Sequence, residues 1–573
     1  MNKILTSMLV ASAVALSACE DNLDIEQKGV TAIENFYQTD EDAQQALIAA
    51  YQGFIWNVCS YQGGSIYVPT YMCATLCGDD IFAAGEKLGD NDVLAAINEF
   101  RYDAGNDAIK NGYLNYYYGI YYCNLVIDNF KNGLPSGGQT AITKRAVAEA
   151  RVLRAYMHMM LALGWNNPPK VDHVLAGDDH PTNCDHDELL KWCAEECEAA
   201  ASDLIERTDI NDKKNAAIVT KGFAWAVAGK CYLFLGDYAN AKTNLWKVID
   251  SKKYQLVKGE QFGNLFHEEG DLNEEKIFEA NLDRNSNLGS VWDGLIQRST
   301  WMQTNIWGWR SSNLNTAIFN EYAGIDGWGG CGVPPAFSKE FVDNDGLDSY
   351  RLNASIVSVE DLIYGKVFEY EKVKGMSDAE KKASTDIGIK PAGLYGQSKY
   401  LMLKKQFKMS DAATPGDNTN VANHIIMRYA EVLLMYAEAC VQTGDAAEAK
   451  TYVNMIQERA KSKTISETVD MNVIKREKKL ELWLEGCRWH DMHRWNDFDG
   501  VKDAGKYVTS VFDKLTRPVA AGETVVEDGD RFYSVYATEA QGRSTGYQEK
   551  YKWLPFPESI TSKNPEITQN AGW

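Results

Sequence analysis

Residues 219–251, "VTKGFAWAVAGKCYLFLGDYANAKTNLWKVIDS", decide the fold because a second stretch of the chain repeats their pattern. The second stretch is residues 425–460, "IIMRYAEVLLMYAEACVQTGDAAEAKTYVNMIQERA", and the two align at their Gly-Asp pairs. Glycine commonly ends a helix and aspartate commonly begins one. Each stretch therefore predicts two antiparallel helices joined by a Gly-Asp turn.

The alignment also pairs residues of similar size and polarity. The pairs are Gly229 with Ala437, Ala241 with Ala449, Leu245 with Val453, and Val248 with Ile456. Small residues at such positions let two helices pack closely, and the pattern resembles a tetratricopeptide helix-turn-helix unit of about 34 residues. One unit cannot bury its apolar face alone, so we expect further, more divergent units within residues 40–165.

The rest of the chain divides by composition. Helical periodicity is strong in 146–164, "AVAEARVLRAYMHMMLALG", whereas Gly, Asn, Ser and aromatic residues dominate 262–420. The latter stretch predicts long loops with short strands, inserted into a helical scaffold. The predicted parts of one intertwined unit are a helical part at 39–261, the loop-rich region at 262–420, and tetratricopeptide-like helices with a tail at 421–573.

The first residues resemble an export signal. Lys3 precedes a mostly apolar run at 4–16 that is too short to span a bilayer. Residues 16–19, Leu-Ser-Ala-Cys, resemble a bacterial lipobox, which predicts a signal peptide at 1–18 and lipid on Cys19. An acidic tether would then occupy 19–38. The alternative is an ordinary secreted protein in which Cys19 is a chance cysteine.

Charge and cysteine content exclude several classes of protein. Lys+Arg 58 against Asp+Glu 80 gives a net charge of −22, which repels nucleic acid. Of the 12 cysteines, 11 remain after Cys19, so complete pairing is impossible, and apolar contexts favour buried thiols. Cys184, His186, Cys193 and Cys197 come nearest to a metal site but match no zinc spacing. We expect no metal and no cofactor.

Four blocks of sequence resemble the hallmark blocks of the SusD/RagB family, outer-membrane lipoproteins of Bacteroidota that bind glycans at the cell surface. The blocks are 148–169 "AEARVLRAYMHMMLALGWNNPP", 428–449 "RYAEVLLMYAEACVQTGDAAEA", 475–495 "KREKKLELWLEGCRWHDMHRW" and 551–573 "YKWLPFPESITSKNPEITQNAGW". They follow the family's order and span most of the chain. "GWNNPPKV" departs from the family's usual turn sequence at that position.

The resemblance implies a mostly α fold, with about four tetratricopeptide-like units and an irregular ligand-bearing part. It implies a SusC-like TonB-dependent outer-membrane transporter as partner, and display on the cell exterior. Acidic residues directly after a lipidated cysteine resemble the family's signal for surface display. They are Glu20, Asp21, Asp24 and Glu26.

Sugar recognition needs flat aromatic rings beside polar groups, and the loop-rich region supplies both. Five of the 15 tryptophans lie within 37 residues, where an even spread over 573 residues would place about one. They are Trp292, Trp301, Trp307, Trp309 and Trp328, with Asn305, Arg310 and Asn313 as weaker polar candidates. The alternative is that these rings fasten the loops to the helical body.

A second candidate is "TLCGDDIFAAG" at 75–85. Its position resembles that of the family's acidic loop, which implies that Asp79 and Asp80 accept hydrogen bonds from ligand hydroxyls. Tyr102 lies near the expected place of an aromatic platform. The alternative is that the two adjacent carboxylates belong to a solvated turn or cap a helix, without any role in binding.

Support in the sequence for a catalytic function is weaker than support for glycan binding. Glu485, Arg488, Asp491 and Arg494 follow i, i+3 spacing, and we interpret them as a structural ion network, as we do Arg151 and Arg154. No nucleophile, metalloprotease or phosphate-loop motif occurs in a fitting context. We therefore predict a non-catalytic protein that binds oligosaccharide or polysaccharide. The alternatives are a tetratricopeptide adaptor for proteins or peptides, and a surface glycosidase, which needs two carboxylates across a cleft.

Overall fold

The computed structural model describes both repeated stretches, the acidic stretch near residue 80 and the C-terminal end. The described residues are 36–59, 75–83, 92–282, 308, 329–358, 375–377, 379–380, 400–402, 404, 408–412, 421–495, 497–498, 500–512, 516–528, 531–542 and 546–573.

Both repeated stretches form helical hairpins. The first consists of α9 (Lys221–Phe234) and α10 (Tyr238–Asp250), and the second of α18 (Tyr429–Gln442) and α19 (Ala446–Arg459). Gly236 and Gly444 stand in the two turns with φ of 72° and 84°, a left-handed conformation that glycine adopts without steric cost. The predicted hairpins are therefore present, with the predicted turn residues.

The aspartate after each glycine caps the following helix. The Asp237 side chain accepts a hydrogen bond from the backbone N–H of Asn240, and Asp445 does the same for Glu448. These are equivalent positions in the two repeats. An N-cap of this kind satisfies a backbone donor that the helix leaves unpaired.

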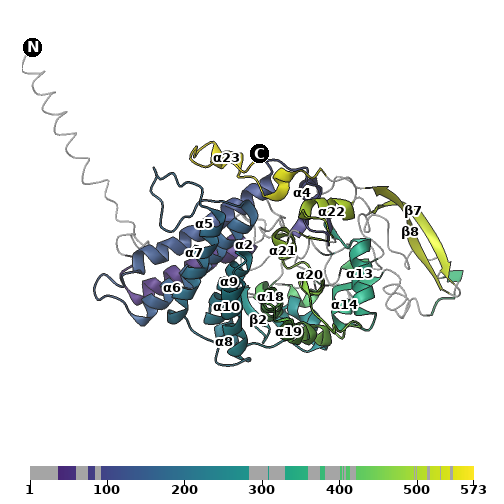
Figure 1. Ribbon diagram of the computed structural model, residues 1–573, viewed down its shortest axis with the longest axis horizontal. Coiled ribbons are helices and arrows are strands. Elements are labelled where there is room, and N and C mark those ends of the chain that lie inside the picture. Colours follow the sequence, from purple (N-terminus) through teal and green to yellow (C-terminus); the bar gives the residue numbers. More distant parts are fainter. Residues whose placement is uncertain are drawn as a thin grey trace, which may run out of the picture.

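Ion pairs join the two hairpins to each other. Lys230 on α9 contacts Glu431 on α18 with Nζ and Oε1 2.7 Å apart. Lys242 on α10 contacts the capping Asp445 at 2.9 Å. Two stretches separated by about 200 residues in sequence thus form one continuous helical layer, as Figure 1 shows for α9, α10, α18 and α19.

The layer extends as a row in which each helix packs against the next. The row begins with α2 (Asp40–Cys59), α5 (Asp107–Phe130), α6 (Ala141–Trp165) and α7 (His186–Ala200), continues through α9 and α10, and reaches α18 and α19. Neighbour-to-neighbour stacking is the packing mode of helical repeat proteins. The predicted mostly α fold is confirmed. The count of four tetratricopeptide-like units stays a prediction.

Shorter helices flank this row. They are α4 (Asp92–Asn98), α8 (Lys213–Ala216), α13 (Pro335–Asp345), α14 (Tyr350–Ser355), α20 (Met471–Glu481), α21 (Arg488–Trp495), α22 (Ala504–Phe512) and α23 (Glu558–Thr561), with 3-10 turns η2 (Ala201–Asp203), η3 (Gly259–Phe266), η4 (Glu268–Gly270), η9 (Met409–Asp411) and η10 (Glu549–Lys552). Because α13 and α14 lie within 262–420, that region contains helices as well as the expected loops and strands.

The strands of the described residues form two-stranded antiparallel sheets, three of which join distant parts of the sequence. They are β1 (Phe82–Ala83) with β3 (Cys331–Gly332), β2 (Lys276–Ala280) with β6 (His424–Arg428), and β4 (Ile356–Ser358) with β5 (Tyr400–Met402). The β2–β6 pair leads directly into α18. The loop-rich region is thus fastened to the helical body by backbone pairing.

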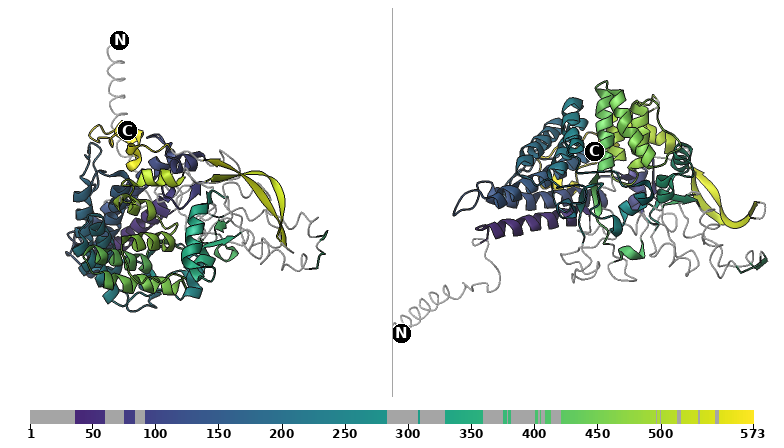
Figure 2. Two further views of the ribbon diagram at one scale, coloured as in Figure 1. Left: turned by 45° about the vertical axis from the view of Figure 1, so that its right-hand side comes forward. Right: turned by 90° about the horizontal axis from the view of Figure 1, so that it is seen from below.

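The fourth sheet is a long ribbon of β7 (Thr516–Asp528) and β8 (Arg531–Gly542). Its strands pair with each other, and Figure 2 shows the ribbon extending away from the helical body. Only helices and a tail were expected in 421–573, and the ribbon was not predicted.

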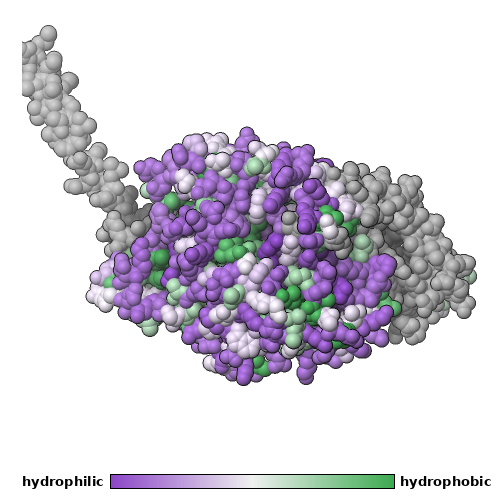
Figure 3. Space-filling model, in the orientation of Figure 1, coloured by the Kyte–Doolittle hydropathy of each residue, from purple (hydrophilic) through white to green (hydrophobic). Residues whose placement is uncertain are grey.

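The surface carries no extended apolar area on the face seen in Figure 3, where hydrophilic residues predominate and apolar ones are scattered. Within the described residues, no helix combines the length and the hydropathy that a bilayer crossing requires. The cysteines with described side chains are free thiols, and Cys231 and Cys440 are fully buried, as their apolar contexts predicted.

Candidate functional site

The acidic stretch at 75–83 forms a tight turn that leads into β1, and a buried asparagine holds it. Asn98 of α4 accepts a hydrogen bond from the Ala83 N–H at 2.9 Å and donates one to the Leu76 carbonyl at 2.7 Å. The Asn98 amide also reaches the Ile81 carbonyl at 3.3 Å. Because one side chain satisfies both ends of the turn, the backbone there is fixed independently of any ligand.

Asp79 lies in a buried ion-pair cluster. Arg488 donates to both of its carboxylate oxygens, at 2.7 and 2.9 Å, and Lys479 donates at 2.9 Å. Burial alone would raise the pKa of Asp79, but the charges of Arg488 and Lys479 outweigh it and hold the pKa well below its usual range. The side chain is 2% exposed, so the structure does not present it to a ligand.

Asp80 has the opposite environment. It is 1% exposed, and neither carboxylate oxygen has a hydrogen-bond partner among the described residues. Burial and the adjacent charge of Asp79 raise its pKa to about 7. Trp483 donates to its backbone carbonyl at 2.9 Å, which helps to hold the side chain inside.

Tyr102 is also buried, at 3% exposure. Its ring stacks on that of the C-terminal Trp573, with centroids 5.5 Å apart and planes inclined by 19°. Tyr551 meets it edge-on at 4.8 Å. The predicted platform is therefore covered by the C-terminal segment, and Asp79, Asp80 and Tyr102 form interior structure, neither an open rim nor a solvated turn.

Residues 292–328, the tryptophan segment, are followed in sequence by β3, which pairs with β1 at the end of this turn. Phe82 and Ala83 of β1 pair with Gly332 and Cys331 of β3, directly after the segment. The Gly329 N–H donates to the Gly308 carbonyl at 2.7 Å. Trp292, Trp301, Trp307, Trp309 and Trp328 lie outside the described residues, as do Asn305, Arg310, Asn313 and Cys19.

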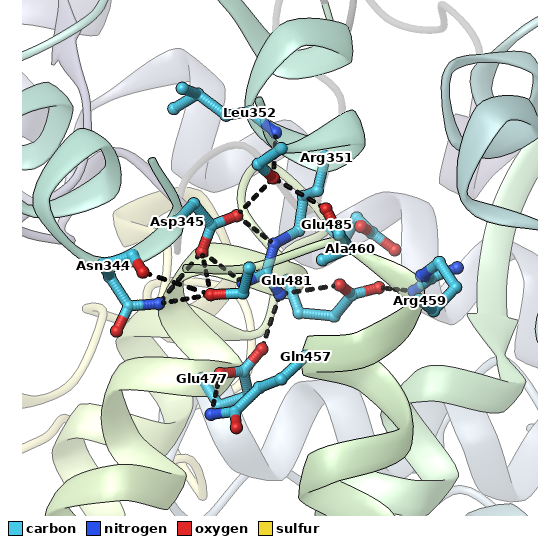
Figure 4. Close-up of polar contacts among 12 residues, drawn as sticks. Asn344, Asp345, Arg351, Leu352, Gln457, Arg459, Ala460, Glu477, Glu481 and Glu485 are labelled. Carbon is cyan, nitrogen blue, oxygen red and sulfur yellow. Dashed lines mark hydrogen bonds and ion pairs between the residues drawn. The ribbon is translucent and has the colours of Figure 1, made fainter. Parts of the chain in front are cut away.

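The four residues predicted to form an ion network all make ion pairs, and a further buried cluster centres on Arg351. Figure 4 shows Arg351 between Asp345 and two glutamates of α20. Its guanidinium contacts Asp345 at 2.8 Å, Glu477 at 2.6 Å and Glu481 at 2.9 Å, and all four side chains are fully buried. Opposite charges in contact stabilise each other, whereas loss of one partner from such a cluster is costly.

The hallmark block at 475–495 pairs mainly across helices. Glu485 contacts Arg428 and Lys404, both at 2.7 Å, and Asp491 contacts Arg494 at 2.7 Å. Only the Asp491–Arg494 pair follows the i, i+3 spacing along one helix. Burial lowers the pKa of Lys404 to about 8, although the Glu485 charge opposes this. The network is structural, as interpreted, but it cross-links helices more than it lines one face.

Arg151 and Arg154 are also structural. Both lie on α6 and contact Glu196 on α7, each at 2.8 Å. Arg154 donates in addition to Asn124 of α5 at 2.8 Å. These contacts hold three neighbouring helices of the row in register.

The described residues contain no group of three His, Cys, Asp or Glu side chains placed to hold a metal ion. Cys193 and Cys197 are fully buried in the α7–α9 packing, and burial raises the pKa of both thiols well above the usual value.

The protein is an α-helical scaffold built from a row of stacked helices. A long inserted region is joined to the scaffold by short β-sheets and contains the candidate binding residues. A sequence model of the SusD family matches residues 274–573, and the chain belongs to this family. The resemblance drawn from the four sequence blocks is thereby confirmed.

Named relatives match along most of their length. SusD-like protein P38 of Formosa agariphila is 24% identical over 528 residues, covering 86% of this chain and 92% of that protein. A SusD-like protein of Bacteroides ovatus is 22% identical over 616 residues, covering 98% and 96%. The similarity thus extends over most of each chain.

Solved structures share the fold. Surface glycan-binding protein A from Bacteroides thetaiotaomicron, in complex with laminarihexaose, superposes with a TM-score of 0.70 at 20% identity. The match covers 93% of this chain and 100% of that one. Surface glycan-binding protein A from Bacteroides fluxus gives a TM-score of 0.67 at 21% identity, covering 94% and 100%.

Proposed function

We propose that this protein binds oligosaccharide or polysaccharide at the cell surface without catalysis and delivers it to a TonB-dependent outer-membrane transporter. Membership of the SusD family, whose structural neighbours include a protein solved with laminarihexaose, supports the ligand class. Lipid on Cys19 would hold the protein at the outer membrane, facing the exterior. The relatives are named as SusD-like or glycan-binding proteins, which supports binding rather than hydrolysis.

The hydrogen bond between Gly308 and Gly329 is the observation that carries the proposed site. Trp307 and Trp309 precede and follow Gly308, and Trp328 precedes Gly329. The bond therefore joins two described glycines that adjoin these tryptophans in the sequence. Several aromatic rings within one small area are what a binder needs to stack on the C–H faces of successive sugar rings.

The polar rim must come from other residues. Arg310, Asn305 and Asn313 are the candidates next to the tryptophans in sequence. Asp79 and Asp80 would contribute indirectly, because their buried turn leads into β1, and β1 pairs with β3 directly after residues 292–328. Their burial excludes them from direct contact in the described conformation.

Affinity electrophoresis against a panel of polysaccharides that includes laminarin tests the proposal. Trp301, Trp307, Trp309 and Trp328 are each changed to alanine, and then all together. Each stacked ring contributes about 1 kcal/mol, so we expect single changes to weaken retention about fivefold and the combined change to abolish it. Trp246→Ala is the matched control, because Trp246 is 40% exposed on α10, outside this segment. Retention that survives the combined change would contradict the proposed site.

The same protein preparation separates the other functions. Release of reducing sugar during long incubation would identify a glycosidase. Absence of glycan retention by the wild-type protein, together with binding of peptide, would favour the tetratricopeptide adaptor.

A further inference from the structure

The β7–β8 ribbon has two outer strand edges that pair with no other strand of the described residues. Its strands pair with each other from Thr516–Gly542 at the base to Asp528–Arg531 at the turn. The ribbon extends away from the helical body (Figure 2). A two-stranded hairpin on its own is only marginally stable in water, whereas a sheet of three or more strands can be stable. A further strand added to this ribbon would therefore stabilise it.

The two edges differ in how well they can accept a further strand. β7 contains Pro518, which has no backbone N–H to donate, and its register shifts between Ala520 and Glu523. Prolines and bulges are devices that keep the edges of sheets from pairing. From 531 to 541, β8 contains no proline and no glycine and is rich in Tyr, Phe, Val and Thr, which favour strands. The edge suited to pairing is therefore that of β8.

The charges of β8 indicate which strand this edge would accept. Its charged residues are Arg531 near one end and Glu539 near the other. When a second copy of β8 lies antiparallel to the first, with Val535 opposite Val535, Arg531 of each copy falls opposite Glu539 of the other. Opposite charges at facing positions stabilise antiparallel strands by roughly 0.2–1 kcal/mol, and two-fold symmetry forms this pair twice.

The same register satisfies the backbone. The N–H and C=O groups of an antiparallel strand alternate between its two edges. Two residues can therefore face each other across a two-fold axis only when they are an even number of positions apart in the sequence. Arg531 and Glu539 meet this condition.

We propose that the outer edge of β8 is an interface at which two copies of this chain associate, forming a four-stranded antiparallel sheet in the order β7–β8–β8–β7. A two-fold interface of this kind uses the same surface on both copies. The outer edges of the new sheet are the two β7 strands, where Pro518 and the register shift oppose further pairing, so assembly ends at two copies. The interface does not include the tryptophan segment, so it is independent of the proposed glycan site.

Sedimentation velocity of the full chain at increasing concentration measures this association. Every protein carries Cys19→Ala, so that no lipid contributes, and physiological salt screens repulsion between the acidic bodies beyond about 8 Å. We expect a monomer–dimer equilibrium. Glu539→Arg turns two attractions into repulsions and should weaken the dimer about tenfold. Arg531→Glu combined with Glu539→Arg restores opposite charges and should recover most of the affinity.

Glu523→Arg is the matched control, because it makes the same change of charge on β7, away from the proposed edge. It should leave the dimer unchanged. Circular dichroism melting of each variant verifies folding.

Cysteine cross-linking locates the interface independently of charge. Val535 is at the centre of the proposed pairing, so mild oxidation of Val535→Cys should link two copies. Thr524→Cys, at the position on β7 that pairs with Val535 within the ribbon, should link far fewer.

Three results would overturn the proposal. They are a parent chain that stays monomeric at every concentration, a Glu539→Arg variant that dimerises as tightly as its parent, and equal cross-linking of the two cysteine variants. Failure of the double charge reversal to recover affinity would equally overturn the proposed register.

Discussion

Two neighbouring aspartates show how strongly the environment of a single residue decides its chemistry. Asp79 receives three hydrogen bonds from Arg488 and Lys479, whereas the Asp80 carboxylate receives none from the described residues. Both are buried. Asp79 therefore stabilises the folded state as an ion-pair partner, and Asp80 destabilises it whenever its carboxylate is ionised.

This difference gives Asp80 a pH-dependent effect on stability. Its pKa of about 7 in the folded state exceeds the usual 3.8, so the folded state holds a proton that the unfolded state releases. The favourable contribution is complete below about pH 4 and is lost as the pH rises to about 7. We expect Asp80→Asn to raise the free energy of unfolding at pH 8 by roughly 1–3 kcal/mol.

Urea unfolding of wild type and Asp80→Asn at pH 8 and pH 4 measures this effect. The difference between the two proteins should shrink toward pH 4, where Asp80 is protonated in both states. Asp79→Asn is the control and should act in the opposite direction, because it leaves Arg488 and Lys479 without their carboxylate. A variant Asp80→Asn that is less stable than wild type at pH 8 would contradict the assigned environment.

The Asp79–Asp80 pair is recognisable in the sequence, but its burial is not. The partners of Asp79 lie 400 and 409 positions away in the sequence, and no local pattern signals a contact at that separation. The same limit applies to Glu485, whose partners Arg428 and Lys404 lie outside its own block. Spacing within one helix predicts which residues share a face, but not which distant cation meets them.

At the scale of elements, the helical hairpins could be predicted because their determinants are local. A glycine with positive φ and a capping aspartate define each turn, and they recur in both repeats at a constant offset. The β7–β8 ribbon was missed although its determinants are also local. Runs rich in Val, Thr, Tyr and Phe stand on either side of Gly529-Asp530 in the sequence, and Asp528 pairs with Arg531, so the register follows from a connection of two residues.

The first hairpin also depends on a close approach at Gly229. A Cβ at this position would lie 2.6 Å from Cγ of Leu245 on the facing helix. Alanine has a helix propensity about 1 kcal/mol more favourable than glycine, but crowding of a packed core costs about 1–3 kcal/mol. We therefore expect Gly229→Ala to lower the free energy of unfolding by about 1 kcal/mol, measured by urea denaturation.

A double-mutant cycle with Leu245→Ala isolates the clash. If crowding is the cause, Gly229→Ala should become stabilising in the Leu245→Ala background, because only the propensity gain remains. The second hairpin has Ala437 at the equivalent position, so a Cβ is compatible with the hairpin itself. Gly229→Ala that stabilises the wild-type background would show that the facing helices move apart at little cost.

At the scale of the whole molecule, the described chain is a negatively charged helical body cross-linked by buried ion pairs, with the tryptophan segment tied to it through β3. Fold class followed from helical periodicity and the repeat, both of which are encoded along the sequence. The contacts that join residues 39–261, 262–420 and 421–573 into one body could not be predicted from local patterns. The β1–β3 and β2–β6 sheets pair residues that lie about 150 to 250 positions apart in the sequence.

The proposed role also requires that this body be held at the outer surface, and the N-terminal residues give a test of that requirement. Each CH₂ group of a lipid chain on Cys19 would contribute about 0.8 kcal/mol of favourable free energy when it enters the membrane. More than one chain is enough for stable anchoring. We expect Cys19→Ala to move the protein from the membrane fraction to the soluble fraction.

Replacement of Glu20, Asp21, Asp24 and Glu26 by their amides should instead leave the protein anchored but facing inward, because only the surface-display signal is lost. Protease added to intact cells distinguishes the two outcomes: the amide variant should be protected, the wild type digested. An amide variant digested as fast as wild type would show that the four acids do not direct display, while membrane retention of Cys19→Ala would refute the lipid anchor itself.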